Sequence, residues 1–279
     1  ETEYAESETA WFETAKLDEG WQAHWITPDV EDNQLHPTMY HTFDVPAPVA
    51  TARAYISGLG LYHFELNGSK VGDEYLTPYC NAYDRWIQYQ TFDITHQLSV
   101  GSNLIAVMLG NGWYKGRYGA NGGSVGFYGD QFALICELHI TLEDGSEQVV
   151  VTDSSWHAQP SPVIESDIFG GEVYDARISK AVPAPGKPLD VIPVEIDMSL
   201  LEARRSIPVC IIEEIRPVAL LHTPAGETVL DMGQNMTGWV RFRTNAPAGT
   251  RIHLQFGELL QQGNFFRDNL RTARAEYTY

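Results

Sequence analysis

The sequence predicts an all-β protein in which an antiparallel β-sandwich is followed by a second, incomplete β-sandwich. Three observations support this fold class. Short apolar segments separated by turn residues recur from residue 21 to about residue 180, with almost no helical periodicity. Residues 132–142 alternate strictly between apolar and smaller or more polar side chains, as a strand with one buried face does. A cluster of prolines at residues 183–193 then precedes further strand-like segments.

The N-terminal residues 1–20 are interpreted as the end of a preceding module. They are acidic and contain one strand-like segment, residues 11–14, with no partner of its own. Because the first residue is not methionine, we expect the chain to begin inside a longer polypeptide, and a missing signal peptide then carries no information about the compartment. The first sandwich is predicted at residues 21–182 and begins with Trp21 and Trp25, two large apolar anchors.

Residues 54–66 are predicted to form an early strand of this sandwich. Gly58 and Gly60 interrupt it, and glycine inside a strand indicates a bulge or a close approach of another backbone. The strand ends at Asn67 and Gly68, a residue pair that favours a tight hairpin turn. We therefore expect the next strand to return beside it.

Two further strands follow in the first sandwich. Residues 104–109 are continuously apolar, which is typical of a central strand buried on both faces. The alternating strand at residues 132–142 ends at Asp144 and Gly145, where glycine tolerates the positive φ of a hairpin turn. Residues 148–152 are expected to return as its partner.

Residues 183–209 are predicted to be a proline-rich linker, and the proline-rich stretch 182–197 is expected to form neither helix nor central strand, because proline lacks the amide hydrogen that both require. The one place where a short helix is expected is residues 198–204. Residues 210–279 are predicted to be the start of a second sandwich, which is incomplete because it is short and stops in mid-strand. Its strands are expected at residues 211–218, 227–232, 239–244 and 250–256.

The charge balance excludes two classes of partner. The chain has 37 acidic and 18 basic side chains and a formal net charge of −19. Such a surface repels a phosphate backbone and an anionic membrane, so we expect no nucleic acid and no membrane as partner. No apolar run reaches the roughly 18 residues that a membrane-spanning helix needs.

The three cysteines indicate neither a disulfide framework nor a metal site, because they are widely spaced. Cys136 and Cys210 lie in apolar runs, where a thiol behaves as a small hydrophobic group, and both are expected to be free and buried. Cys80 lies in a loop and is interpreted as incidental.

The sequence contains no HExxH or GxxxxGK[ST] pattern, and the glycine-rich segment GANGGSVGFYGD does not lead from a strand into a helix, as a GxSxG nucleophile elbow does. A glycosidase needs two carboxyl groups roughly 5 to 9.5 Å apart across the sugar, and sequence alone cannot pair them. Glu137 and Glu213 alternate on strand surfaces and are interpreted as solvated. We therefore assign no catalytic residue and no metal ligand.

A glycine-rich segment with many aromatic residues, residues 111–130, is the first candidate for binding. Aromatic faces in loops commonly hold the apolar faces of sugar rings, and loops of this length are usually functional or disordered. The alternative is that the aromatic side chains anchor a long loop onto the sandwich. The candidate carbohydrate-binding residues of this segment are Trp113, Tyr114, Arg117, Tyr118 and Tyr128.

Two smaller groups supplement this segment. Tyr83, Asp84 and Trp86 form a second patch that can face the same end of the sandwich, or that simply holds its own loop together. Glu172 and Asp175, which follow a diglycine, are either functional carboxylates or members of a polar network with a nearby arginine, because buried charges need partners.

Six motifs in sequence order carry a family resemblance. They are YISGLGLYHFELNGSKVGD, YQTFDIT, LGNGWYKGR, GGEVYDARI, DMGQNMTGWVRF with LQFGELL, and NLRTARAEYTY. Together they resemble bacterial α-L-rhamnosidases of glycoside hydrolase family 78 over nearly the whole chain from Trp21 onward. Each motif alone is weak, but their shared order makes the resemblance specific.

The resemblance implies a series of β-sandwiches, here of the galactose-binding-like or jelly-roll type, followed by a catalytic (α/α)₆ barrel that holds the acid and the base. It also implies cleavage with inversion of configuration. Residues 21–180 look like the N-terminal sandwich of the family, and residues 210–279 look like the front of the sandwich joined to the barrel. The opening strand looks like the end of a fibronectin-type module. The catalytic carboxylates of the family belong to the barrel, so none is carried over to this chain.

Some members of this family contain a calcium-dependent rhamnose-binding module with an Asp-Asn pair shortly before the NG strand. In this sequence Gly58, Leu59 and Gly60 occupy that place. We therefore expect no cofactor, and calcium held by backbone carbonyl oxygens is the alternative.

Three hypotheses of function follow. The chain is expected to be the non-catalytic accessory region of an inverting α-L-rhamnosidase, which packs against the barrel of the same polypeptide and has no activity alone. The second hypothesis is a carbohydrate-binding module for rhamnose-containing glycans. The third is a structural interaction domain.

Overall fold

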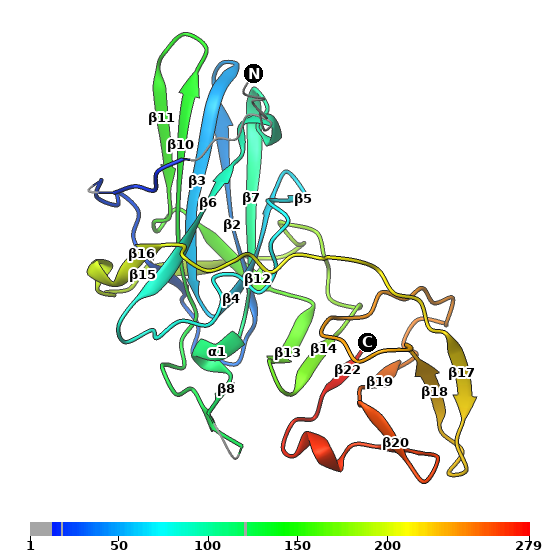
Figure 1. The fold of residues 1–279 in the computed structure, drawn as a ribbon. Helices are drawn as coiled ribbons and strands as arrows, with labels where there is room; N and C mark the ends of the chain where they lie inside the picture. Colours follow the sequence, from blue (N-terminus) through cyan, green and yellow to red (C-terminus); the bar gives the residue numbers. More distant parts are fainter. Residues whose placement is uncertain (1–12, 18, 120–121) are drawn as a thin grey trace, which may run out of the picture.

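The structure is a computed structural model that describes residues 13–17, 19–119 and 122–279. Figure 1 shows a tall β-sandwich on one side and a smaller group of short strands, which includes the C-terminus, on the other. The all-β prediction is confirmed. In the described part of the chain, helix is limited to single turns, namely η1 (Thr95–Gln97), α1 (Gly112–Lys115), η2 (Met198–Leu200) and η3 (Asp268–Leu270).

The tall sandwich is one 12-stranded sheet that folds back on itself into two layers. Strands β1 and β15 join the two layers at their edges. The first layer contains β11 (Glu147–Val151), β10 (Ala133–Leu142), β3 (Val49–Leu59), β6 (Ile87–Asp93), β16 (Leu201–Ala203) and β1 (Ile26–Pro28). The second contains β15 (Leu189–Pro193), β12 (His157–Pro160), β2 (Pro37–Val45), β7 (Gly101–Gly110), β4 (Leu61–Leu66) and β5 (Ser69–Lys70).

The main hydrophobic core lies between these layers. Because side chains alternate along a strand, Leu134, Cys136 and Leu138 of β10 point into it, and Phe64 and Val107 enter from the opposite layer. Each such side chain contributes about 1.5–3 kcal/mol when fully buried. The alternation predicted for β10 is confirmed.

The three cysteines are free thiols, but they differ in exposure. Cys136 is buried in the core, as expected. Cys210 is only half-buried, which differs from the expectation, because the extended segment around it has little protein on one side. Cys80 is exposed.

A second core covers the outer face of the first layer near one end. Ala133 and Ile135, the outward residues of β10, pack there with Trp25 and Ile87. Partly buried side chains from distant segments cover this cluster, namely Trp21, Trp113, Tyr114, Tyr128, Val151, Val194, Ile196, Met198, Leu200 and Leu201. The first layer is therefore buried on both faces at this end of the sandwich.

The glycine positions of the first sandwich behave as predicted. Gly60 has φ +109° and separates β3 from β4, so the chain passes from one layer to the other at this residue. A Cβ atom at Gly60 would lie 2.5 Å from the Gly110 carbonyl oxygen, which confirms the close backbone approach. Asn67 and Gly68 both have positive φ and connect β4 to β5 in a hairpin. Gly145 has φ +83° in the turn from β10 to β11.

The expectation that residues 182–197 contain no central strand is wrong. β15 lies between β1 and β12 in the sheet. Its last residue is Pro193, so the missing amide hydrogen falls at the strand end, where a sheet tolerates it. Of the helix expected at residues 198–204, only η2 forms, and β16 follows it in parallel with β6.

A four-stranded sheet joins the sandwich to the smaller group of strands. Its order is β13 (Val163–Asp167), β14 (Gly171–Tyr174), β22 (Glu276–Thr278) and β19 (His253–Gln255). Two separate hairpins accompany it, formed by β17 (Ala219–His222) with β18 (Thr228–Asp231) and by β20 (Leu259–Gln261) with β21 (Asn264–Phe266).

The predictions for the second sandwich are only partly correct. β18 and β19 lie inside the expected strands 227–232 and 250–256, but residues 211–217 and 239–244 form no strand. A strand needs a hydrogen-bonded neighbour, and these segments find none in the described part of the chain. Large apolar side chains are left exposed in these segments, including Ile211 (50%) and Ile212 (90%).

The strand expected at residues 11–14 falls partly outside the described residues, and Glu13 and Thr14 are not in a strand. None of the helices in the described residues has the length and apolar character needed to cross a membrane. The division into a first sandwich, a linker and a second sandwich stays a prediction.

Candidate functional site

The first and second aromatic patches come together at one end of the sandwich. Tyr83 is buried, and its ring lies 5.0 Å from that of Tyr114 and 5.2 Å from that of Tyr128, centroid to centroid. Burial raises the pKa of the Tyr83 hydroxyl. A Cβ atom at Gly129 would collide with the Tyr114 hydroxyl, which explains this glycine. Of the two interpretations that the sequence left open, the packing of Tyr114 and Tyr128 on the second core agrees with aromatic side chains that anchor the loop onto the sandwich.

Helix α1 is attached to the sandwich by a buried lysine. The Nζ atom of Lys115 donates a hydrogen bond to the carbonyl oxygen of Asn33 and lies 4.3 Å from the centroid of the Phe132 ring. Burial lowers the pKa of Lys115. Trp113 on the same turn packs, half-buried, against the second core.

The outer rim of this loop remains accessible. Tyr118 lies 5.7 Å from Phe127 and 5.5 Å from Tyr128 between ring centroids, and Phe127 is 60% exposed. These residues flank the short hairpin of β8 (Arg117–Tyr118) and β9 (Ser124–Val125). The accessible aromatic surface of the loop is therefore its rim rather than Trp113 or Tyr114.

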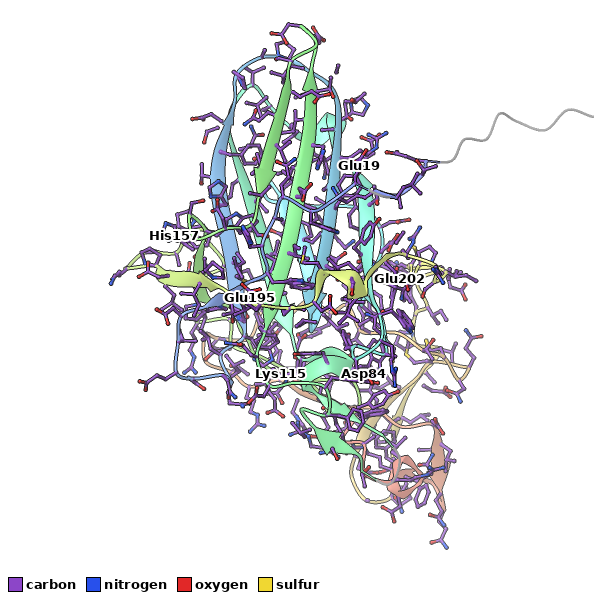
Figure 2. The ribbon with its side chains drawn as sticks, turned by 90° about the vertical axis from the view of Figure 1, so that its left-hand side faces the viewer. Glu19, Asp84, Lys115, His157, Glu195 and Glu202 are labelled. Carbon is purple, nitrogen blue, oxygen red and sulfur yellow. The ribbon has the colours of Figure 1, made fainter. Side chains whose placement is uncertain are left out.

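The remaining residues of the second patch lie at the surface. Asp84 and Arg85 are exposed and form a loose ion pair of 3.5 Å, and Trp86 is half-buried. Figure 2 shows Asp84 close to the end of the sandwich where Lys115 also lies.

The diglycine motif forms the junction between the tall sandwich and the C-terminal strands. Gly171 has φ +101°, and a Cβ atom there would overlap the carbonyl oxygen of Glu276. β14 pairs in parallel with β22, so that Gly171 lies opposite Glu276 and Glu172 opposite Tyr277. Only glycine allows the two strands to approach this closely.

The two candidate carboxylates of this motif differ in environment. Glu172 is exposed overall, and desolvation of its carboxyl group by the surrounding protein raises its pKa. Asp175 accepts hydrogen bonds from the Arg177 guanidinium at 2.6 and 2.8 Å, and these bonds lower its pKa to about 2. Asp175 therefore has the arginine partner that its sequence context suggested.

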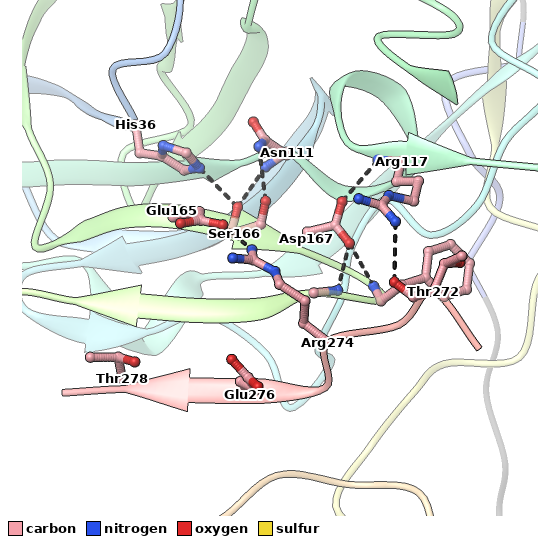
Figure 3. A network of polar contacts seen from close by, with 12 residues as sticks. His36, Asn111, Arg117, Glu165, Ser166, Asp167, Thr272, Arg274, Glu276 and Thr278 are labelled. Carbon is pink, nitrogen blue, oxygen red and sulfur yellow. Dashed lines mark hydrogen bonds and ion pairs between the residues drawn. The ribbon is translucent and has the colours of Figure 1, made fainter. Parts of the chain in front are cut away.

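A polar network fastens the junction from the sandwich side (Figure 3). Asp167 accepts three backbone hydrogen bonds, from Phe169 at 2.9 Å, Gly170 at 2.6 Å and Arg117 at 2.9 Å. The Arg117 guanidinium donates in turn to the carbonyl oxygen of Thr272 at 3.2 Å. Arg117, a candidate for sugar binding, thus contacts the C-terminal segment in this structure.

His36 and Ser166 form the inner part of the same network. The Ser166 Oγ atom lies 2.9 Å from His36 Nε2 and accepts the amide hydrogen of Asn111 at 2.9 Å. Because His36 Nδ1 faces the carbonyl oxygen of Gln34 at 3.1 Å, we assign the proton to Nδ1, and Nε2 accepts the Ser166 hydroxyl hydrogen. Burial lowers the pKa of His36 to about 4.

Sequence reasoning missed this network, because its members are far apart in the chain. One local signal was available. Asp167 stands two and three residues before the amides of Phe169 and Gly170, and an aspartate in that position commonly closes a turn.

The interpretation of Glu137 as a solvated surface residue is wrong. Its side chain is fully buried, accepts a hydrogen bond from Lys16 Nζ at 2.8 Å, and also binds the amides of Gln22 (2.9 Å) and Ala23 (3.2 Å) and the ring of His139. Burial by itself raises the pKa of Glu137, but the hydrogen bonds outweigh it and lower the pKa. The N-terminal segment covers this face of β10, which alternation cannot reveal.

A groove of about 480 Å³ lies beside that buried pair, between the N-terminal segment and the η2–β16 segment. Tyr89 and Trp21 line it together with Met198 and Leu201. Two carboxylates line it as well. Glu19 is exposed, and Glu202 forms an ion pair with Arg205 at 3.0 Å; Figure 2 shows Glu19 and Glu202 on the same flank of the sandwich.

No group of three or more histidine, cysteine, aspartate or glutamate side chains with metal-binding geometry occurs within residues 13–17, 19–119 and 122–279. Gly58 and Leu59, which occupy the place of the expected Asp-Asn pair, lie inside β3.

Comparisons with known proteins identify the family. Residues 47–211 match the model of the α-L-rhamnosidase N-terminal domain, and residues 221–279 match that of the bacterial α-L-rhamnosidase concanavalin-like domain. The chain belongs to the α-L-rhamnosidase family. The resemblance drawn from the six motifs is therefore confirmed.

Individual members of the α-L-rhamnosidase family agree over most of the chain. An α-L-rhamnosidase of Streptomyces avermitilis is 36% identical over 255 residues, which are 88% of this chain and 24% of that protein. The crystal structure of the Aspergillus terreus α-L-rhamnosidase superimposes with a TM-score of 0.87 at 33% identity and covers 92% of this chain and 31% of that one. The Streptomyces avermitilis structure in complex with L-rhamnose has a TM-score of 0.82 at 35% identity over 88% of this chain and 24% of that one. The chain thus spans between 24% and 31% of the length of the curated rhamnosidases that it matches.

The junction lies between the two rhamnosidase matches. β14 falls in the N-terminal match and β22 in the concanavalin-like match, and the two strands are hydrogen-bonded in one sheet. The rhamnosidase units are therefore joined through backbone pairing as well as through the connecting segment.

Proposed function

We propose that this chain is the non-catalytic accessory region of an inverting α-L-rhamnosidase whose full polypeptide hydrolyses terminal α-L-rhamnosides. The observation that carries the proposal is the pairing of β14 with β22, which fuses two rhamnosidase units into one rigid support. The chain accounts for less than a third of the length of its relatives, which leaves room for a catalytic barrel in the full protein.

The environments of the candidate carboxylates support a non-catalytic role. A general acid must hold a proton near neutral pH, and Asp175, with a pKa of about 2, is ionised there. Glu172 has a raised pKa, as a general acid would, but its neighbour in the parallel register is Tyr277 rather than a second carboxylate. Hydrolysis with inversion needs two carboxyl groups roughly 6.5–9.5 Å apart.

In this role the hydrogen bonds among Asp167, Arg117 and Thr272 position the aromatic loop relative to the C-terminal segment. Asp167 accepts the amide hydrogen of Arg117, and the Arg117 guanidinium donates to the Thr272 carbonyl oxygen, so these contacts link the loop to the C-terminal segment. Such a unit forms one wall of the substrate cleft in the full polypeptide, against the (α/α)₆ barrel.

The test compares this chain with the full polypeptide on p-nitrophenyl α-L-rhamnoside. We expect no release of nitrophenol by the isolated chain and steady release by the full protein, with proton NMR detecting the inverted anomer of rhamnose first. Turnover by the isolated chain that disappears in Glu172→Gln would overturn the accessory role. Absence of rhamnose release by the full protein would overturn the activity.

A second candidate function is a carbohydrate-binding module, and the exposed rim formed by Tyr118 and Phe127 favours it. Titration calorimetry with L-rhamnose, with and without calcium, tests this function. Phe127→Ala is the informative variant, because its ring is 60% exposed and its removal leaves the second core intact. Loss of saturable heat in this variant alone supports binding at the rim.

A further inference from the structure

The groove beside the buried Lys16–Glu137 pair has a defined construction. Glu137 fixes the N-terminal segment through Lys16 and through the amides of Gln22 and Ala23, which makes one wall. β16 pairs in parallel with the edge of β6, placing Ala203 opposite Tyr89, which makes the other wall. Both walls are therefore held by hydrogen bonds.

The floor of the groove is aromatic. The rings of Trp21 and Tyr89 lie 5.3 Å apart at an interplanar angle of 86°, and Lys16 Nζ stands 5.2 Å from the Trp21 ring. Trp21 is half-buried, so part of its ring contributes to the surface of the groove. A partly accessible aromatic ring supplies apolar surface that the C–H groups of a sugar can contact.

The rim of the groove is polar and carries one excess negative charge, because it has two carboxylates and one guanidinium. Glu202 and Arg205 stand side by side at 3.0 Å, and the carboxylate of Glu19 and the hydroxyl of Ser199 complete the rim. Lys16 is already neutralised by Glu137. A carboxylate that accepts and a guanidinium that donates can together bind neighbouring hydroxyl groups, whereas the excess carboxylate disfavours an anionic ligand.

We propose that this groove is a sugar-binding subsite for a neutral monosaccharide or the end of a neutral glycan. Its volume of about 480 Å³ falls within the range of small-molecule pockets, roughly 300–1,000 Å³, and an apolar floor with a few polar groups at the rim is the usual composition of such pockets. The choice of L-rhamnose as the probe rests on the proposed function.

Rim variants are the sharpest test, because Trp21 also packs against the second core and its removal would disturb the fold. Titration calorimetry and saturation-transfer NMR of this chain with L-rhamnose should show saturable, millimolar binding. Glu202→Gln and Arg205→Ala should each weaken it about tenfold, as expected when a hydrogen bond to a charged group is lost. Glu214→Gln and Arg241→Ala, which alter an exposed ion pair outside the candidate sites, should leave the affinity unchanged.

Each other outcome overturns the subsite. Absence of saturable binding would show that the groove is not a sugar-binding subsite. Binding that Phe127→Ala weakens and Glu202→Gln leaves unchanged would place the sugar at the rim of the aromatic loop instead of in the groove. Rhamnose release by the full polypeptide is measured separately, so failure of the subsite and failure of the proposed activity are distinguishable.

Discussion

The Nζ atom of Lys16 lies 2.8 Å from the carboxylate of Glu137, and both side chains are buried on the outer face of the first sheet layer. The pair fastens the N-terminal segment across β10 and forms one wall of the groove. Removal of one member of a buried pair leaves the other charge uncompensated, which is costly.

Glu137→Gln should therefore lower the free energy of unfolding by about 3 kcal/mol, measured by urea denaturation. Glu213→Gln is the matched control, because Glu213 is an exposed carboxylate, and its effect should stay within about 0.5 kcal/mol. Adding Lys16→Met to Glu137→Gln should recover part of the loss, since no unpaired charge then remains. Equal losses in the Glu137 and Glu213 variants would contradict the role of the pair.

Stability should depend on pH through His36. Its pKa falls from 6.5 to about 4 on burial, so the unfolded chain binds a proton more readily than the folded chain between these values. Burial of neutral His36 therefore does not reduce the free energy of unfolding above pH 6.5. As the pH falls from 6.5 toward 4, the free energy of unfolding should decrease by up to about 3 kcal/mol. Unfolding measured from pH 4 to 7 should show a weaker dependence in His36→Asn. An unchanged slope in the variant would assign the pH dependence to other groups.

Gly171→Ala should separate β14 from β22, because its Cβ atom would overlap the Glu276 carbonyl oxygen. Gly186→Ala is the matched control, since Gly186 also has positive φ, +121°, but has no atom within 4 Å of its Cβ position. The control should lose only about 1 kcal/mol from backbone strain. Hydrogen exchange of the β22 amides should accelerate in Gly171→Ala alone, and similar exchange in both variants would argue against the junction.

Asp167→Ala should lower the free energy of unfolding by about 2 kcal/mol, because three backbone donors lose their acceptor. Glu165→Ala breaks the ion pair with Arg274 at the same junction, but both side chains are about half exposed, so the loss should stay below about 1 kcal/mol. Thermal denaturation distinguishes the two variants, and the reverse order would show that the ion pair holds the junction.

Calcium should have no effect on the folded chain. The described residues contain no cluster of acidic ligands, and calcium binding to the native state would raise the melting temperature by mass action. Melting curves with calcium and with EDTA should coincide. A rise with calcium that EDTA reverses would indicate a site built from backbone carbonyl oxygens.

The all-β fold and most strands of the first sandwich were predictable from local patterns. The alternation along β10, the glycine at position 60 and the hairpin at Asn67 and Gly68 each depend on a few neighbouring residues, and the structure contains them as predicted. β15 was not predictable, because the pattern of prolines does not reveal that its free amides face neighbouring strands.

The features of the candidate site likewise fall into those that the sequence predicts and those that only the tertiary structure shows. The sequence by itself determined which aromatic residues share a loop, which strands alternate and to which family the motifs point. Only the tertiary structure decided that Tyr83 and Tyr114 pack together, that Glu137 is buried under the N-terminal segment, and that β14 pairs with β22. The physical reason is that periodicity identifies the residues on one face of a strand, whereas burial and pairing depend on distant segments that cover that face.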